Sequence, residues 1–226
     1  MLRQTAFADV LPACSADGHC YIKNDSPEQW QGTVNISALH LDTGELEHVS
    51  STPVSLEAGA GVLQAFCARG NGACQALDQL LPQCYQSPEH QDQGATTESS
   101  PLAACMLVLD AISSKSGEVA THNVLALAPP KAMALPKNVT VTTKVSATQH
   151  GNVVVVMEAT GGVALYVVAT TTLAGRFSDN AIFLRPGTPT TISFVPFGEL
   201  AASSSTDLAK ELSGSLRVEH LAQHCC

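Results

Sequence analysis

The residue types that most often perform chemistry are present in this chain, but their spacing matches none of the common catalytic motifs. Twenty Asp and Glu side chains could supply paired carboxylates for general acid–base chemistry. Nearly all of them fall in expected loops or at strand ends, and only Glu158 lies inside an apolar run, residues 153–159. Because successive strand side chains point to opposite faces, we expect Glu158 to face solvent. The sequence also has no Gly-x-Ser-x-Gly, His-Glu-x-x-His or phosphate-loop motif.

The residue pattern gives little support for a metal site, a cofactor site or an aromatic surface that binds carbohydrate. The eight His share no metal-ligand spacing, and no Cys-x-x-Cys pair occurs. We therefore expect surface His residues, no metal site and no cofactor. Residues 70–72, Gly-Asn-Gly, read as a turn rather than a phosphate cradle. Trp30 is the only Trp, and the ten aromatic residues give weak support for a stacked carbohydrate-binding platform.

Cysteines and glycosylation triplets indicate the compartment. Eight Cys allow 105 disulfide pairings, so the connectivity stays open. Three Asn-x-Ser/Thr triplets make Asn24, Asn35 and Asn138 candidate glycan acceptors. Together these features favour an oxidising lumen or the cell exterior. Residues 1–10 nevertheless lack an apolar run of signal-peptide length, so the chain is either cytosolic or the tail of a longer precursor.

Composition and charge exclude several classes of function. The 226 residues are 45% hydrophobic, which argues against a disordered chain. No apolar run approaches the roughly 20 residues that cross a bilayer, so no membrane span is expected. The net charge of −9, without a basic stripe, argues against nucleic acid as a partner. Residues 1–132 carry all of the net negative charge, because residues 133–226 have six basic and six acidic residues. This asymmetry suggests two domains.

The second half predicts a series of short strands. Apolar and polar residues alternate in the first of these segments, and β-branched runs separated by Gly or Pro-Gly turns follow. The expected strands are residues 137–147, 153–159, 163–172, 177–184, 190–195 and 214–221. Only residues 205–212 have helical spacing, with Leu208 and Leu212 at i and i+4. This frequency of strands and turns is typical of an immunoglobulin-like sandwich.

The first half repeats this pattern less regularly. Its expected strands are residues 33–41, 45–51, 54–56, 62–67, 105–112 and 123–128. A short helix is expected at 76–81, ended by Pro82, and a polar loop at 88–101. The sequence therefore predicts an all-β chain with two immunoglobulin-like β-sandwich domains in tandem. We expect the domains at 13–130 and 131–222, with tails at 1–12 and 223–226.

One local cluster in the second half predicts a structural corner. Ser178, Asp179 and Asn180 have side chains that bond neighbouring backbone groups. Phe177 and Phe183 would anchor the corner in the core. The remaining members of this corner motif are Arg176 and the turn residues Pro186 and Gly187.

These same residues carry a family resemblance. The stretch 175–180, Gly-Arg-Phe-Ser-Asp-Asn, with the downstream Pro-Gly turn and strand, resembles the C-terminal immunoglobulin-like domain of β-mannosidases of glycoside hydrolase family 2. The resemblance runs from about Pro136 to Leu221. Upstream, residues 80–84 and 105–109 are similar to the preceding sandwich domain of these enzymes, and within that similarity Cys84 and Cys105 form a candidate disulfide.

The resemblance implies a role as part of a larger enzyme. The family releases terminal β-linked mannose with retention, using two Glu on a (β/α)₈ barrel, and no part of this sequence resembles that barrel. The implied partner is thus the catalytic barrel of a longer lysosomal or secreted protein, which would bind the β-mannoside oligosaccharide. We expect this chain to be an inactive scaffold. The alternatives are the accessory region of another family 2 enzyme, such as an exo-β-glucosaminidase, and a free-standing carbohydrate-binding or adhesion module.

Overall fold

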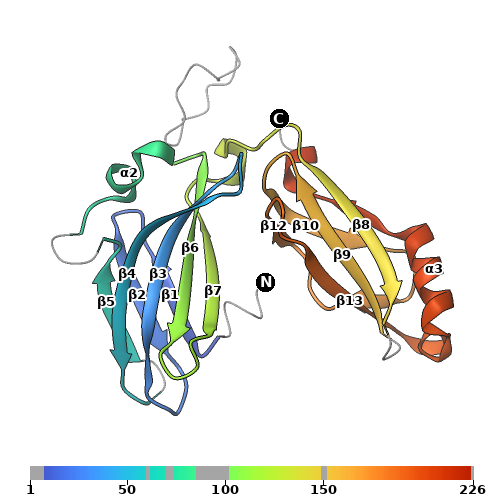
Figure 1. Cartoon of the computed structure of the whole chain (residues 1–226), viewed down its shortest axis with the longest axis horizontal. Coiled ribbons are helices and arrows are strands. Elements are labelled where there is room, and N and C mark those ends of the chain that lie inside the picture. Colours follow the sequence, from blue (N-terminus) through green and yellow to red (C-terminus); the bar gives the residue numbers. More distant parts are fainter. Residues whose placement is uncertain (1–7, 60–61, 70–73, 85–101, 149–151, 225–226) are drawn as a thin grey trace. The chain divides into compact units, whose positions relative to one another are not determined.

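A computed structural model describes residues 8–59, 62–69, 74–84, 102–148 and 152–224. The chain divides into two compact units, which consist mainly of residues 2–134, the N-terminal unit, and 135–226, the C-terminal unit. Across the described residues, fourteen strands form four sheets, and all strands paired within these sheets run antiparallel (Figure 1). The predicted all-β class with two immunoglobulin-like sandwiches is confirmed.

The N-terminal unit is a sandwich of a three-stranded and a four-stranded sheet. The smaller sheet has the order β1-β2-β5 and the larger β4-β3-β6-β7. The strands are β1 (Val10–Cys14), β2 (His19–Asn24), β3 (Trp30–His40), β4 (Leu46–Leu56), β5 (Val62–Cys67), β6 (Cys105–Ser113) and β7 (Val119–Ala126). Short helical turns are α2 (Leu77–Leu80), η1 (Pro82–Cys84) and η3 (Pro130–Ala132).

Alternation along β3 explains how this sandwich buries its core. Val34, Ile36 and Ala38 are fully buried between the sheets, whereas the intervening polar residues are only half-buried. Strand β6 lies beside β3 and buries five consecutive residues at its start. A continuous apolar run is what a strand covered on both faces requires. These two central strands therefore supply much of the core of the unit.

The C-terminal unit has the same layered plan. Its four-stranded sheet has the order β11-β13-β9-β8 and its three-stranded sheet the order β12-β10-β14. The strands are β8 (Thr140–Ala147), β9 (Val153–Thr160), β10 (Ala164–Thr170), β11 (Gly175–Phe177), β12 (Ile182–Leu184), β13 (Thr190–Pro196) and β14 (Arg217–Glu219). Its helical elements are η4 (Gly198–Ala202), α3 (Ser205–Ser215) and η5 (Leu221–Gln223).

Helix α3 follows from its cap and its apolar spacing. The Ser204 hydroxyl accepts a hydrogen bond from the Asp207 backbone N–H, which satisfies one free donor of the first turn. Leu208 and Leu212, one turn apart, are buried in the core of this unit. Among the described residues, no helix combines the length and hydrophobicity needed to cross a bilayer.

Several boundaries differ from those expected from the sequence. Strands β1 and β2 were not predicted, and β1 pairs Val10 with Asn24, so the expected tail 1–12 contributes three residues to the sandwich. The expected strand 177–184 is wrong, because β11 and β12 belong to different sheets. Helix α3 continues to Ser215, so β14 begins later than expected, and η5 extends past residue 222. The predicted loop 88–101 lies outside the described residues.

Candidate functional site

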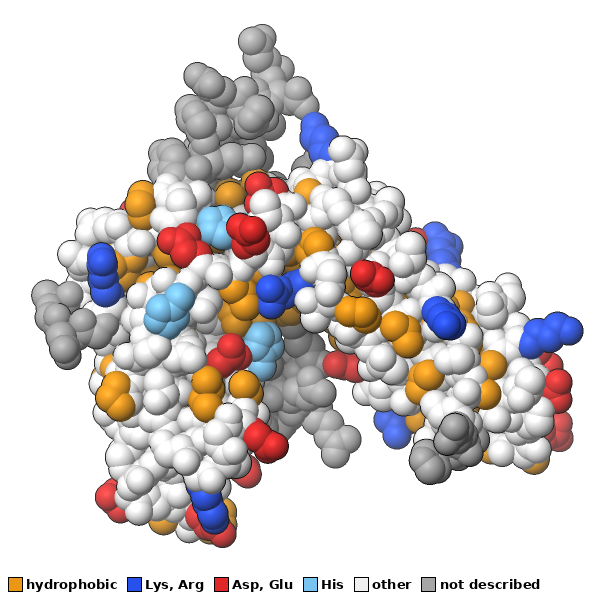
Figure 2. All heavy atoms as spheres, in the orientation of Figure 1, with side chains coloured by type: hydrophobic (Ala, Val, Ile, Leu, Met, Phe, Trp, Pro, Cys, Tyr) orange, Lys and Arg blue, Asp and Glu red, His pale blue; other side chains and the backbone are white. Residues whose placement is uncertain are grey.

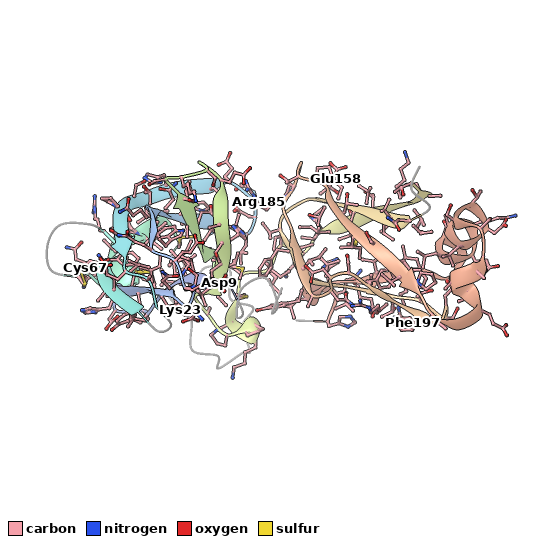
Figure 3. The ribbon with its side chains drawn as sticks, turned by 90° about the horizontal axis from the view of Figure 1, so that it is seen from below. Asp9, Lys23, Cys67, Glu158, Arg185 and Phe197 are labelled. Atoms are coloured by element: carbon pink, nitrogen blue, oxygen red, sulfur yellow. A yellow bond between two sulfur atoms is a disulfide. The ribbon has the colours of Figure 1, made fainter. Side chains whose placement is uncertain are left out.

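The carboxylate that stood out in the sequence lies on the outer side of a sheet. Glu158 belongs to β9, where Val153, Val155 and Met157 are buried and the alternate positions are only half-buried. Its Cα partner across the sheet is Thr142 of β8. Figure 3 labels Glu158 on the C-terminal unit. Alternation therefore explains Glu158 as an outward-facing residue of a half-buried strand.

Strand pairing in the N-terminal unit creates a His–carboxylate pair that sequence spacing did not reveal. His122 of β7 is the Cα partner of Asp110 of β6, and its Nδ1 lies 2.6 Å from Asp110 Oδ1. No fixed motif marks this pair, and a register shift between Ala111 and Ile112 makes His122 the residue opposite Asp110. Figure 2 shows the His side chains visible on this unit lying apart from one another. Across the described part of the chain, no three His, Cys, Asp or Glu side chains could together hold a metal ion.

A second His–carboxylate pair lies next to a cysteine. His40 Nε2 is 3.2 Å from Glu47 Oε2, which also accepts a 2.7 Å hydrogen bond from Gln83 Nε2. On the other side of the ring, His40 Nδ1 is 3.7 Å from Cys105 Sγ. This order of thiol, imidazole and carboxylate resembles a nucleophile with its base. The sulfur of Cys105 is, however, bonded to Cys84, so it cannot act as a nucleophile here.

A serine and a histidine also meet on the outer face of the larger sheet. Ser51 Oγ donates to Asn35 Oδ1 at 2.8 Å and lies 3.3 Å from His48 Nε2. The hydroxyl proton of Ser51 is directed to Asn35. The His48 imidazole is therefore not placed as a base that could remove this proton. These side chains form exposed hydrogen-bonded pairs on a rigid sheet.

The six cysteines of the described residues form three disulfides, all within the N-terminal unit. The bonds join Cys14 to Cys20, Cys67 to Cys74 and Cys84 to Cys105. The first links two residues that are Cα partners in the β1–β2 hairpin. The third is the pair named from the family resemblance, and both of its residues are fully buried. Cys225 and Cys226 lie outside the described residues.

The three candidate glycan acceptors differ sharply in accessibility. Asn24 is fully buried, and its Nδ2 donates to the backbone oxygens of Glu28 and Glu57 at 2.9 and 3.1 Å. Because this nitrogen is buried and bonded inside the fold, the structure argues against a glycan on Asn24. Asn35 is half-buried in the middle of β3, whereas Asn138 is exposed just before β8. Asn138 is therefore the most accessible acceptor among the three.

The corner motif joins the two sheets of the C-terminal unit. Ser178 N–H donates to Ser193 O at 2.8 Å, and Ser193 N–H donates to Ser178 Oγ at 2.9 Å, which continues the pairing of β11 with β13. The rings of Phe177 and Phe194 lie 5.4 Å apart. At this point the chain leaves one sheet and crosses toward β12 in the other.

Asn180 stabilises this crossing. Its Oδ1 accepts from Ala169 N–H at 2.8 Å and its Nδ2 donates to Ala169 O at 3.1 Å, so one amide side chain takes the place of a strand neighbour for β10. Beyond β12, Thr188 N–H donates to Arg185 O at 3.2 Å, and Gly187 has a φ of 71°, which favours glycine. The geometry supports a structural role for Asn180 and the Pro186–Gly187 turn.

The expectation that the His residues lie at the surface is wrong for one of them, because a single His carries no spacing signal that would reveal its burial. His220, directly after β14, is only 4% exposed. Burial lowers the pKa of His220 below its ordinary value of 6.5, and the nearby His224 adds to this effect. The Val139 backbone acts in the opposite direction, although neither ring nitrogen of His220 has a hydrogen-bond partner among the described residues. The neutral imidazole is therefore the form that the folded C-terminal unit favours.

Comparison with known proteins defines the class of the C-terminal unit. Residues 135–224 match the Ig_mannosidase family, described as an Ig-fold domain. The C-terminal unit is thus an Ig-fold domain of the β-mannosidase type, which confirms the resemblance for this part of the chain. A comparison with the sequences of curated proteins gave no match.

Solved structures extend the likeness to both units. The β-D-mannosidase from Dictyoglomus thermophilum matches with a TM-score of 0.56 and 18% identity, over 95% of this chain and 22% of that chain. The exo-chitosanase from Amycolatopsis orientalis matches with a TM-score of 0.51 and 16% identity, over 96% of this chain and 26% of that chain. At these identities the likeness concerns the fold. The chain spans about a quarter of the length of either protein.

Proposed function

We propose that this chain is the C-terminal accessory region of a family 2 glycosidase, specifically a β-mannosidase that hydrolyses terminal β-D-mannose residues of oligosaccharides or glycoproteins. The observation that carries the proposal is the match of residues 135–224 to the Ig-fold domain of mannosidases. In this role the two sandwiches are a non-catalytic scaffold, and the β-mannoside substrate binds to a catalytic barrel supplied by the rest of the enzyme.

The extent of the structural matches supports a role as part of a larger protein. Both similar enzymes are about four times the length of this chain, and the likeness covers nearly all of it. The arrangement of the His–carboxylate pairs also supports a scaffold, since the sulfur beside His40 is held in a disulfide. A rigid β-sandwich suits the support of a neighbouring catalytic domain.

The disulfides support a lysosomal or secreted parent protein. Three disulfides in one small unit are typical of proteins that fold in oxidising compartments. The exposed Asn138 would then carry the glycan of a glycoprotein. The compartment and the glycan on Asn138 are both part of the proposal.

An exo-β-glucosaminidase is the second candidate for the parent enzyme. The TM-scores of the β-mannosidase and exo-chitosanase matches, 0.56 and 0.51, differ by only 0.05 and describe nearly the same degree of likeness. The fold therefore suits either substrate. A free-standing binding module is the third candidate.

The test is an activity assay on the longest protein encoded in frame with this sequence. We expect that protein to contain a barrel and to cleave an aryl β-mannoside faster than an aryl β-glucosaminide. The 226-residue chain, assayed beside it, should release no sugar above the blank. Preference for the glucosaminide would replace the first candidate by the second. Absence of both activities, or mannose release by the short chain alone, would overturn the proposal.

A further inference from the structure

The smaller sheet of the N-terminal unit, β1-β2-β5, has an apolar outer face (Figure 1). In β2, Cys20 and Ile22 are fully buried, so the alternate residues Tyr21 and Lys23 point away from the core. Strand pairing places residues of β1 and β5 beside them in two cross-strand rows, which are Ala13–Tyr21–Ala65 and Leu11–Lys23–Leu63. All of these side chains except Lys23 are apolar or aromatic, and we call the two rows the β2 face.

The β2 face places exposed apolar side chains next to one another. Leu63 is 61% exposed, the largest value among the exposed large hydrophobic residues of the described chain, and Tyr21 is 42% exposed. The two are diagonal neighbours, because Tyr21 pairs with Ala65, two residues after Leu63. Single exposed hydrophobic residues are ordinary, whereas a group of them marks a surface that contacts another protein.

The larger sheet of the same unit shows how this chain builds a face that contacts water. Val34, Ile36 and Ala38 of β3 face the core, so the intervening residues face outwards. These outward residues are all polar: Thr33, Asn35 and Ser37. An antiparallel sheet with one solvated side normally alternates in this way. The β2 face departs from this pattern, and its composition is that of a covered surface.

Strand β5 is a second, independent sign of a cover. It is an edge strand, since the sheet order is β1-β2-β5. Natural proteins protect such edges with charged residues, Pro or bulges. Residues 62–67, Val-Leu-Gln-Ala-Phe-Cys, contain no charged residue and no Pro, and β5 pairs with β2 without a register shift. The apolar face and the unprotected edge therefore meet at Leu63.

The β2 face is electrically neutral. Lys23 is the charged residue of the two rows, and its Nζ forms an ion pair with the Asp25 carboxylate. Beyond the end of the rows, His19 Nδ1 lies 3.1 Å from Asp17 Oδ2. Because residues 1–132 as a whole have five basic and fourteen acidic residues, the neutrality is particular to this face. It suits an apolar, uncharged protein surface rather than an ion or a nucleic acid.

The size of the similar enzymes indicates what covers the β2 face. The likeness takes in 95% and 96% of this chain but only 22% and 26% of the β-mannosidase and exo-chitosanase chains. A parent glycosidase of that length would place a large folded neighbour beside this unit. A second copy of the chain is a poorer fit. Pairing of two β5 edges would complete the edge, but it would leave Leu11, Ala13 and Tyr21 in solvent.

We propose that the β2 face is the surface by which this chain docks against the rest of the parent glycosidase, with Leu63 and Tyr21 as its main anchors. The inference rests on the proposed function and adds the surface through which the scaffold is attached. Tyr suits this role, since its ring buries a large apolar area while its hydroxyl can still form a hydrogen bond. The opposing surface is apolar and uncharged.

Hydroxyl-radical footprinting tests the β2 face directly. The 226-residue chain and the longest protein encoded in frame with it are labelled side by side, and side-chain oxidation is measured by mass spectrometry. Tyr21 and Leu63 should be oxidised about fivefold more slowly in the longer protein, because the core of an interface excludes water. Val119 of β7 and Phe197 of the C-terminal unit, 53% and 49% exposed, are the controls and should be oxidised equally in both proteins.

Two matched variants test the apolar character of the contact. Leu63→Asp and Val119→Asp each place a charge at an exposed apolar position of a strand in the N-terminal unit. In the longer protein, Leu63→Asp should return the oxidation of Tyr21 to the rate of the short chain, whereas Val119→Asp should leave Tyr21 protected. Protection of Tyr21 that survives Leu63→Asp would overturn the proposal.

The remaining outcomes separate this proposal from its alternatives. Equal oxidation of Tyr21 and Leu63 in the two proteins overturns it. A short chain that sediments as a dimer, and as a monomer after Leu63→Asp, overturns it in favour of a second copy. The glycosidase assay of the longer protein reports separately on the proposed function. Activity without protection overturns the docking surface alone, and protection without activity supports the docking surface while overturning the proposed function.

Discussion

Replacing Asn24 by Ala should destabilise the N-terminal unit far more than the loss of a surface amide would. Asn24 is fully buried, and its side chain makes three hydrogen bonds to the backbone. Two run from Nδ2 to the oxygens of Glu28 and Glu57, and the third from Ser26 N–H to Oδ1. These bonds tie the end of β2 to the connection that directly follows it and to Glu57, 33 residues further along the chain.

The magnitude follows from the number of these bonds and from what can replace them. A typical intramolecular hydrogen bond contributes about 1 kcal/mol, so three contribute about 3 kcal/mol. The Glu28 oxygen keeps a second donor, because Ser26 Oγ also bonds to it at 2.9 Å. Glu57 O and Ser26 N–H lose the only side-chain partner described above. Since two buried groups then lack their partner and the third keeps one, we expect a loss of about 2–3 kcal/mol in the free energy of unfolding.

The assay is urea denaturation followed by tryptophan fluorescence. Trp30 belongs to the N-terminal unit, so its signal follows the unit that Asn24 stabilises. Asn138→Ala is the matched control, because Asn138 is exposed and lies in the other unit. A loss below about 1 kcal/mol for Asn24→Ala, or an equal loss for the control, would refute the assignment of Asn24 as a structural residue.

Three further predictions concern the C-terminal unit alone, and a fourth compares glycan acceptors in both units. Asn180→Ala should cost about 1–2 kcal/mol by chemical denaturation, because two hydrogen bonds to Ala169 are lost while the exposed site lets water replace them; no measurable loss would contradict this. Phe177→Ala should cost about 2 kcal/mol in the same assay, because its ring is half-buried against Phe194 and a fully buried Phe costs roughly 3–5 kcal/mol. A loss under about 0.5 kcal/mol would place the ring outside the core. Because the pKa of His220 is lowered in the folded state, the unfolded chain takes up this proton at a higher pH than the folded unit does. The free energy of unfolding of this unit should therefore fall as the pH drops below 6.5, and His220→Gln should reduce the slope of that dependence. An unchanged slope would show that His220 does not cause the pH dependence. In secreted material, mass spectrometry should find a glycan on Asn138 and none on Asn24, and a glycosylated Asn24 would be incompatible with its buried position.

The strands of the second half could be predicted because their signals are local. The run that predicted residues 153–159 became β9, Val153–Thr160, and the spacing of Leu208 and Leu212 gave the buried face of α3. Strands β1 and β2 gave no such signal. Pro12 and the cysteines stand where β-branched residues would mark a strand, and the disulfide between Cys14 and Cys20 reinforces the hairpin. Local periodicity therefore recovered elements rich in Val and Thr and missed the β1–β2 hairpin, which a disulfide supports.

The arrangement of side chains around the sites required information that local periodicity does not contain. His122 and Asp110 meet because β6 and β7 pair in one particular register, and a shift by one residue would place them on opposite faces. The same holds for the pocket of about 480 Å³ beside Trp30, which is lined by residues 26, 28–31 and 113–115 and forms because β3 pairs with β6. Asn24 shows the reverse error, since its triplet matches a surface motif while its amide completes a buried network. A motif specifies what a side chain can do chemically, but strand register and burial determine whether it can reach a ligand or an enzyme.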